Sequence, residues 1–249
     1  MPLRKINFSL PAINATDSGF SPRAGFPTIK FSIPAQDVLL ETLSLRLVGR
    51  FQVKSDATTA SDSSDNTMTN LGKGPGDADI QPASKVTMAP FGGVKTLIDK
   101  VVIQSKKVAK ELTSDVNYSQ YVALREARFG ADSDFRNSLP SRSMSLGRNA
   151  VEAQCRTMIS VPAAVEALDK NRGQEFCIRL DIPMLQGKLL HMGDDFLGGL
   201  MITLHLAPES AFFATLQDGM VSTPTDTIDT YRYTLQDLHL TGRYQVPAA

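Results

Sequence analysis

Three histidines, His191, His205 and His239, are the side chains in this sequence best suited to acid–base or metal chemistry. A metal site needs several donors close together, and the three histidines are widely spaced along the chain. His191 has two carboxylates close by, because Asp194 and Asp195 follow within four residues. We interpret this group as a solvated turn rather than a metal site.

Other patterns that carry chemistry are missing from the sequence. It has no G-x-S-x-G nucleophile motif, no recognisable Cys/His pair and no dinucleotide-binding glycine pattern. The Gly72-Lys73-Gly74 segment lacks the spacing of a phosphate-binding loop. Cys155 and Cys177 are too few for a disulfide framework. We therefore predict no catalytic, cofactor-binding or metal-binding residues, and a protein that is not an enzyme.

Charge and hydropathy limit the partners of the chain. The 26 Lys and Arg residues balance 26 Asp and Glu residues, so no net field attracts nucleic acid or an anionic membrane. The best local basic surface is the 130–150 loop with Arg136, Arg142 and Arg148, which we interpret as solvated. The sequence has no signal-like or membrane-spanning apolar run. We therefore expect that the protein is made in the cytoplasm and does not insert into a membrane.

The clearest elements that could position side chains are two amphipathic strands joined by a Gly-rich connection, over residues 176–207. Apolar side chains alternate with polar ones on both sides of this connection, as a strand with one buried face requires. Pro183 closes the first strand and Gly198-Gly199 opens the second. The buried faces are predicted to comprise Phe176, Ile178, Leu180, Ile182, Leu200, Ile202, Leu204 and Leu206.

Similar alternation predicts further strands. They cover residues 29–33, 43–53, 94–104, 108–113, 153–161 and 231–246. In the 43–53 strand, Leu43, Leu45 and Leu47 are expected on the apolar face, whereas Thr42 and Ser44 are expected on the polar face.

Two irregularities and two helices complete this pattern. Gly49 falls on the apolar face and suggests a close approach by another segment. A change of phase at Gln236-Asp237 predicts a bulge. Residues 114–129, capped by Ser114 or Asp115, and residues 162–168 are expected to be helical.

These elements define the expected organisation. Residues 1–28 are predicted as an extended N-terminal arm with a short strand at 6–10, and residues 29–249 as a single domain with a polar loop at 55–85. The sequence has no β-α-β rhythm, which argues against a parallel sheet. The predicted fold class is all-β: an antiparallel, eight-stranded jelly-roll β-sandwich with long loops and one or two short helices.

Two segments resemble a known family. Phe91-Gly92-Gly93-Val94 leads into a strand, a turn and a second strand with Glu111, and then Asn117-Tyr118 at a helix start. Ile182-Pro183-Met184, a loop, and residues 198–207 form the second pattern. Over about residues 29–54 and 90–246, the chain resembles jelly-roll capsid proteins of virophages, polinton-like viruses and large DNA viruses. The Tyr and Asn of the helix start occur here in reversed order.

The resemblance implies a viral structural protein of the virion that assembles into an icosahedral capsid. Major capsid proteins of that lineage carry two jelly rolls, and this chain has room for one. It therefore implies a penton, another minor component or a half-length relative of the major protein. The expected partners are further copies, first of all in a homopentamer, and other capsid proteins.

Three alternatives come from other classes. A non-viral jelly-roll module for carbohydrate or a receptor would be expected to display aromatic residues, but the chain has no Trp. A degenerate cupin-like metalloenzyme would need a close His-x-His pair with a carboxylate. A small RNA virus coat protein would need a densely basic arm, whereas this arm has only Arg4, Lys5 and Arg23.

Overall fold

The computed structural model describes most of the β-sandwich and part of its surroundings. It covers residues 3–17, 19–22, 27–55, 86–88, 93–129, 174–180, 182, 189–215 and 231–247. The predicted 153–161 strand, the 162–168 helix and the 130–150 loop lie outside these residues, as does nearly all of the 55–85 loop.

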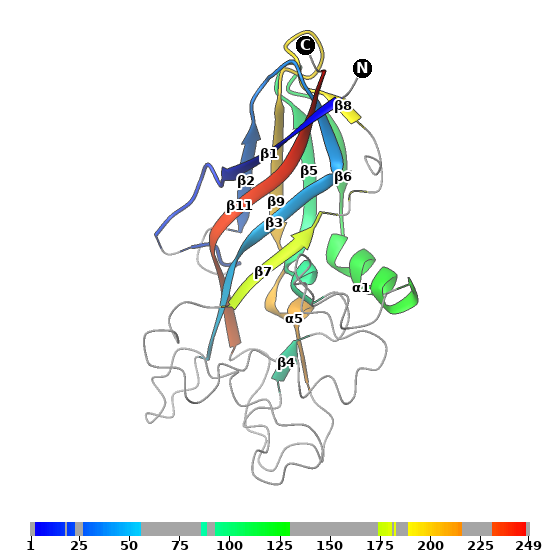
Figure 1. Ribbon diagram of the computed structural model, residues 1–249. Coiled ribbons are helices and arrows are strands. Elements are labelled where there is room, and N and C mark those ends of the chain that lie inside the picture. Colours follow the sequence, from blue (N-terminus) through cyan, green and yellow to red (C-terminus); the bar gives the residue numbers. More distant parts are fainter. Residues whose placement is uncertain are drawn as a thin grey trace.

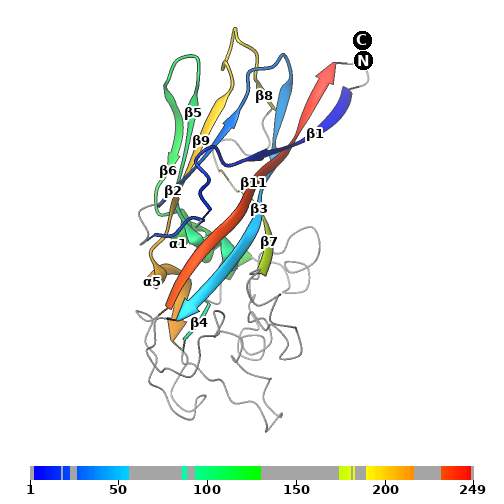
Figure 2. The ribbon, with the colours of Figure 1, turned by 90° about the vertical axis from the view of Figure 1, so that its left-hand side faces the viewer.

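Two antiparallel sheets form the body of the protein (Figure 1). Sheet A has the order β1-β11-β3-β7, with β8 also paired to β3, and sheet B has the order β2-β9-β5-β6. Figure 2 shows the sheets as two layers. The strands of sheet A are β1 (Leu3–Pro11), β3 (Leu39–Ser55), β7 (Gln174–Arg179), β8 (Leu189–His191) and β11 (Tyr231–Pro247). Those of sheet B are β2 (Thr28–Ile33), β5 (Ile98–Ser105), β6 (Glu111–Asp115) and β9 (Leu200–Leu206).

The order of the strands defines a jelly roll. Counting β1, β2, β3, β5, β6, β7, β9 and β11 as first to eighth, sheet A has the order 1-8-3-6 and sheet B the order 2-7-4-5. First pairs with eighth, second with seventh, third with sixth and fourth with fifth, all antiparallel. This nested pairing is that of one long hairpin wound into two sheets, the double Greek key of a jelly roll. The predicted fold class is confirmed.

The remaining elements lie toward one end of the sandwich (Figure 1). They are a 3-10 helix, η2 (Gly93–Leu97), the helices α1 (Tyr118–Phe129) and α5 (Glu209–Phe212), and a two-stranded sheet of β4 (Val86–Met88) and β10 (Phe213–Thr215).

One hydrophobic core lies between the sheets. In β9, buried and half-buried residues alternate along the whole strand, as expected, and β7 follows the same pattern. Val101, Val102 and Ile103 of β5 are all buried, so this part of the strand is buried on both faces. The largest fully buried side chains are Tyr118, Tyr233, Phe31, Phe176, Ile29, Ile33, Leu40, Leu45 and Leu47.

The bulge predicted in the last strand is present where β11 passes Gly49. The register of β11 against β3 shifts between Gln236 and His239, and Asp237 has a positive φ of 51°. A Cβ atom on Gly49 would lie 2.5 Å from Leu238 Cδ2 and 3.0 Å from the Gln236 carbonyl oxygen. The close approach inferred from Gly49 is therefore confirmed, because the bulged segment of β11 occupies that space.

The predicted buried face of the third strand is wrong in its first half. Leu43 is 42% exposed, whereas Thr42 and Ser44 are buried. The cause is a second register shift, in which Glu41 pairs with Arg243 and Arg46 with Thr241. Four residues of β3 thus face one residue of β11, and the alternation changes phase before Leu45.

Two predicted boundaries also need correction. Residues 93–97 form a 3-10 helix rather than the start of a strand. Ser114 and Asp115 do not cap a helix, since they end β6, and α1 starts later at Tyr118. Asn117 precedes the helix with a positive φ of 58°, and its carbonyl accepts a hydrogen bond from the Tyr121 N–H at 3.0 Å.

The short strand predicted near the N-terminus is present and longer than expected. β1 pairs with β11 from Leu3 to Pro11, so these residues form a terminal strand of sheet A. Further along, the N–H groups of Phe20 and Leu235 each donate to the other residue's carbonyl at 2.8 Å, which ties this segment to β11.

Candidate functional site

His191 lies where the β2–β3 connection meets the β8–β9 turn. Its Nε2 is 3.2 Å from Asp37 Oδ1, and its Nδ1 accepts a hydrogen bond from the Gly193 N–H at 3.2 Å. The imidazole packs on Phe196 with 4.3 Å between ring centroids. Both ring nitrogens therefore have partners within the protein, and the contacts join two loops at the end of the sandwich.

The carboxylates that sequence places beside His191 do not share this arrangement. Asp194 and Asp195 are exposed in a turn, as interpreted from the sequence. The carboxylate that contacts the imidazole is Asp37, which is 154 positions earlier and gives no local signal. Within the described residues, no group of three or more His, Cys, Asp or Glu side chains could hold a metal ion.

His205 and His239 point outward from the sheets, since each stands between two buried residues of its strand. His239 is exposed on β11. His205 pairs across sheet B with Thr28 of β2 and Lys100 of β5. Partial burial lowers the pKa of His205 from its usual value, the Lys100 charge lowers it further, and Asp99 opposes the shift. These effects favour the neutral form of His205.

One of the two cysteines lies within the described residues. Cys177 is a free thiol, half-buried on β7 opposite Val48. Cys155, Arg136, Arg142 and Arg148 lie outside the described residues.

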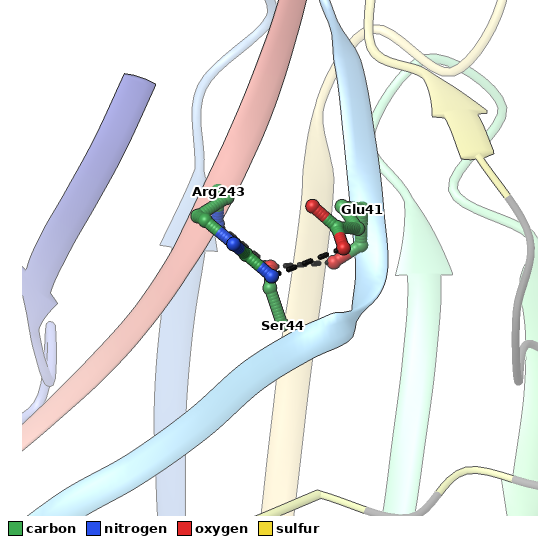
Figure 3. Close-up of polar contacts among 3 residues, drawn as sticks. All are labelled: Glu41, Ser44 and Arg243. Carbon is green, nitrogen blue, oxygen red and sulfur yellow. Dashed lines mark hydrogen bonds and ion pairs between the residues drawn. The ribbon is translucent and has the colours of Figure 1, made fainter. Parts of the chain in front are cut away.

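A polar contact at the second register shift was missed by sequence reasoning (Figure 3). The Ser44 hydroxyl donates to the Glu41 carbonyl oxygen at 2.6 Å and accepts from the Arg243 N–H at 2.7 Å. An Arg243 guanidinium nitrogen lies 3.1 Å from Glu41 Oε1. The buried serine thus satisfies backbone groups that the irregular ladder leaves unpaired, which is a structural role.

A second feature is a cavity of about 320 Å³ where β6 ends and α1 begins. Its lining residues are Ser114, Asp115, Val116, Tyr118 and Tyr121. Burial raises the pKa of the Asp115 carboxyl above its usual value. Asp115 Oδ2 is buried and has no hydrogen-bond partner among the described residues.

Exposed apolar side chains continue from this cavity along α1. Val116 is 61% exposed, Tyr121 40% and Leu124 70%. Tyr121 and Leu124 are three residues apart on the helix and therefore share one face. By contrast, Tyr118 and Val122 of the same helix are buried.

Comparison with known proteins gives structural neighbours alone. No known family profile matches the sequence, and no curated protein is significantly similar to it. Among solved structures, the chain is similar to the mavirus major capsid protein, with a TM-score of 0.45, 13% identity and coverage of 98% of this chain and 46% of that one. It is also similar to a chain of the PBCV-1 virus capsid, with a TM-score of 0.39, 10% identity and coverage of 98% and 43%.

The chain spans less than half the length of both neighbours. Both TM-scores are below 0.5, so the jelly-roll assignment rests on the strand pairing described above. Among the described residues, no helix has the length and apolar character needed to cross a membrane.

Proposed function

We propose that this protein is a structural subunit of a viral capsid and that it acts by self-association in the virion. The observation that carries the proposal is where the family-like sequence patterns fall in the jelly roll. Ile182-Pro183-Met184 follows β7, the sixth strand of the jelly roll. Residues 198–207 contain β9, the seventh strand. Asn117-Tyr118 stands at the start of α1, as in the capsid family pattern.

Because one fold supports many functions, surfaces that call for a partner matter as well. Among the described strands, β1 and β2 end the sheets on one side, and β6 and β7 end them on the other. Ile6 in β1 is 42% exposed, and Val116, which follows β6, is 61% exposed. Terminal strands with apolar side chains favour contacts with neighbouring chains.

Within this class, a single-jelly-roll vertex subunit is the role we favour, with five copies in a ring and other capsid proteins around it. A closed ring uses two different faces of each subunit, and the sandwich has two such flanks. Penton, minor and half-length major subunits differ in the number of copies that associate, so oligomer size separates them.

The test is the mass of the purified protein in solution. Native mass spectrometry and light scattering after size exclusion, over a hundredfold range of concentration, should reveal a discrete oligomer or particles. A pentamer supports the vertex role, and a trimer or hexamer supports another capsid role. A monomer throughout that range, with no rings or particles by electron microscopy, would refute the proposed function.

A further inference from the structure

The cavity between β6 and α1 has the chemistry of a site for a basic side chain. Tyr118 and Tyr121 supply aromatic walls, and Asp115 supplies a carboxylate. Aromatic faces attract cations, and carboxylates pair with guanidinium and ammonium groups. A volume of about 320 Å³ is at the small end for ligand sites, which suits one long side chain.

Asp115 gives this cavity its selectivity. Its carboxyl group lines the cavity, although one of its two oxygens, Oδ2, is inaccessible to water. A partly buried carboxylate pairs best with a donor that also carries positive charge. An acidic ligand would be repelled by the carboxylate, and a purely apolar one would leave its negative charge unpaired.

The surroundings indicate that the basic group belongs to a polypeptide. Val116, Tyr121 and Leu124 extend the cavity into an exposed apolar strip. Beside it, β6 is the last strand of sheet B among the described strands. A terminal strand next to apolar side chains is suited to another chain segment, which can contact both.

The opposite flank of the same protein offers a matching segment. β1 and β2 contain three basic residues, Arg4, Lys5 and Lys30, all exposed, and no acidic residue. β6 contains Glu111 and Asp115 and no basic residue. Figure 1 shows β2 and β6 on opposite sides of the sandwich.

We propose that the Asp115 cavity receives Arg4 or Lys5 from β1 of a second copy of this chain. Such a contact joins two different surfaces, so it is heterologous and can close into a ring. This inference rests on the proposed function, because it assigns the residues through which the subunits associate. It also assigns β1 a role beyond pairing with β11.

Charge reversal tests this pairing. We expect Asp115→Lys to weaken association at least about tenfold, because it places like charges together. The double variant Arg4→Glu/Lys5→Glu should do the same. Combining all three changes restores opposite charges and should recover most of the lost association, as measured by sedimentation velocity.

Controls separate this contact from effects on folding. Asp194→Lys makes the same change at an exposed turn residue and should leave association within about twofold. Asp115→Asn preserves the side-chain shape and should also weaken association. It therefore tests the contact even if Asp115→Lys does not fold. Circular dichroism and thermal unfolding verify the fold of every variant.

The outcomes distinguish the two proposals. If the wild-type protein assembles and Asp115→Lys and Asp115→Asn assemble equally well, the cavity assignment is wrong and the capsid proposal stands. If the Asp115 variants weaken assembly but the Arg4/Lys5 double variant does not, β1 is not the donor and the pairing is overturned. A wild-type protein that stays monomeric at all concentrations overturns both proposals.

Discussion

Gly199 is a residue at which a single added methyl group should damage the fold. It has a φ of +86°, where residues with a Cβ are disfavoured. A Cβ at this position would lie 2.5 Å from the Ile33 carbonyl oxygen and 2.9 Å from the Ala35 nitrogen. Both are backbone atoms, and Ile33 pairs with Leu200 in sheet B, so relief would require movement of the strand end.

The expected loss in Gly199→Ala can be worked from these two effects. The left-handed conformation costs a residue with a Cβ about 1–2 kcal/mol. Forcing a methyl group into occupied space costs about 1–3 kcal/mol more. The total of about 2–5 kcal/mol is a large part of the roughly 5–15 kcal/mol that stabilises a folded protein.

Equilibrium urea unfolding measures this loss, and Gly198→Ala provides a matched control. Gly198 also has a positive φ, of +60°, but its Cβ would meet the Lys107 Cβ at 2.8 Å and the Lys107 nitrogen at 3.2 Å, in an exposed turn. We expect Gly198→Ala to cost at least about 1 kcal/mol less, because that turn can adjust. The reasoning is refuted if both variants lose the same free energy of unfolding, or if Gly199→Ala loses less than about 1 kcal/mol.

Two further predictions concern buried polar groups. Ser44→Ala should lower the free energy of unfolding by about 1–3 kcal/mol, because the Arg243 N–H loses its acceptor. The control Ser9→Ala, at an exposed position of β1, should change the free energy of unfolding by less than about 0.5 kcal/mol. Equal effects of the two variants in urea unfolding would contradict this role for Ser44. Asp115→Asn should stabilise the dilute monomer at pH 7 by less than about 1 kcal/mol, because burial raises the pKa of this half-exposed carboxyl above that of the unfolded chain. The wild-type protein then loses stability relative to the variant as pH rises from about 4 through the raised pKa, and a difference in melting temperature that does not change with pH would count against it.

The regular parts of the fold could be predicted from the sequence because they obey a local rule. In β9 and β7, one buried face requires an alternation with a period of two, and nothing interrupts it. The bulge at Asp237 was also predictable, since a change of phase within one strand leaves a visible trace in the sequence. Gly49 gave a second sign of the same event from the facing strand.

Features set by distant segments left no such trace. The register shift at residues 42–45 depends on where β11 pairs, and the polar Thr42 and Ser44 resemble surface residues when β3 is considered alone. His191 contacts Asp37 rather than its sequence neighbours, because the β2–β3 connection meets the β8–β9 turn only in the folded chain. The Asp115 cavity likewise forms at the junction of a strand and a helix, and the sequence had assigned Asp115 to a helix cap.

Both sides of the proposed contact lie on elements that the fold already holds in place. β1 pairs with β11 along its whole length, and β6 pairs with β5 up to Asp115. Association would therefore order few additional residues, and little of the contact energy would be spent on loss of conformational freedom. Because Arg4 and Lys5 are exposed before association, their attraction to Asp115 is screened as salt rises. The association rate of the wild-type protein should consequently fall between low and physiological ionic strength, whereas that of Asp115→Asn should depend on salt less steeply.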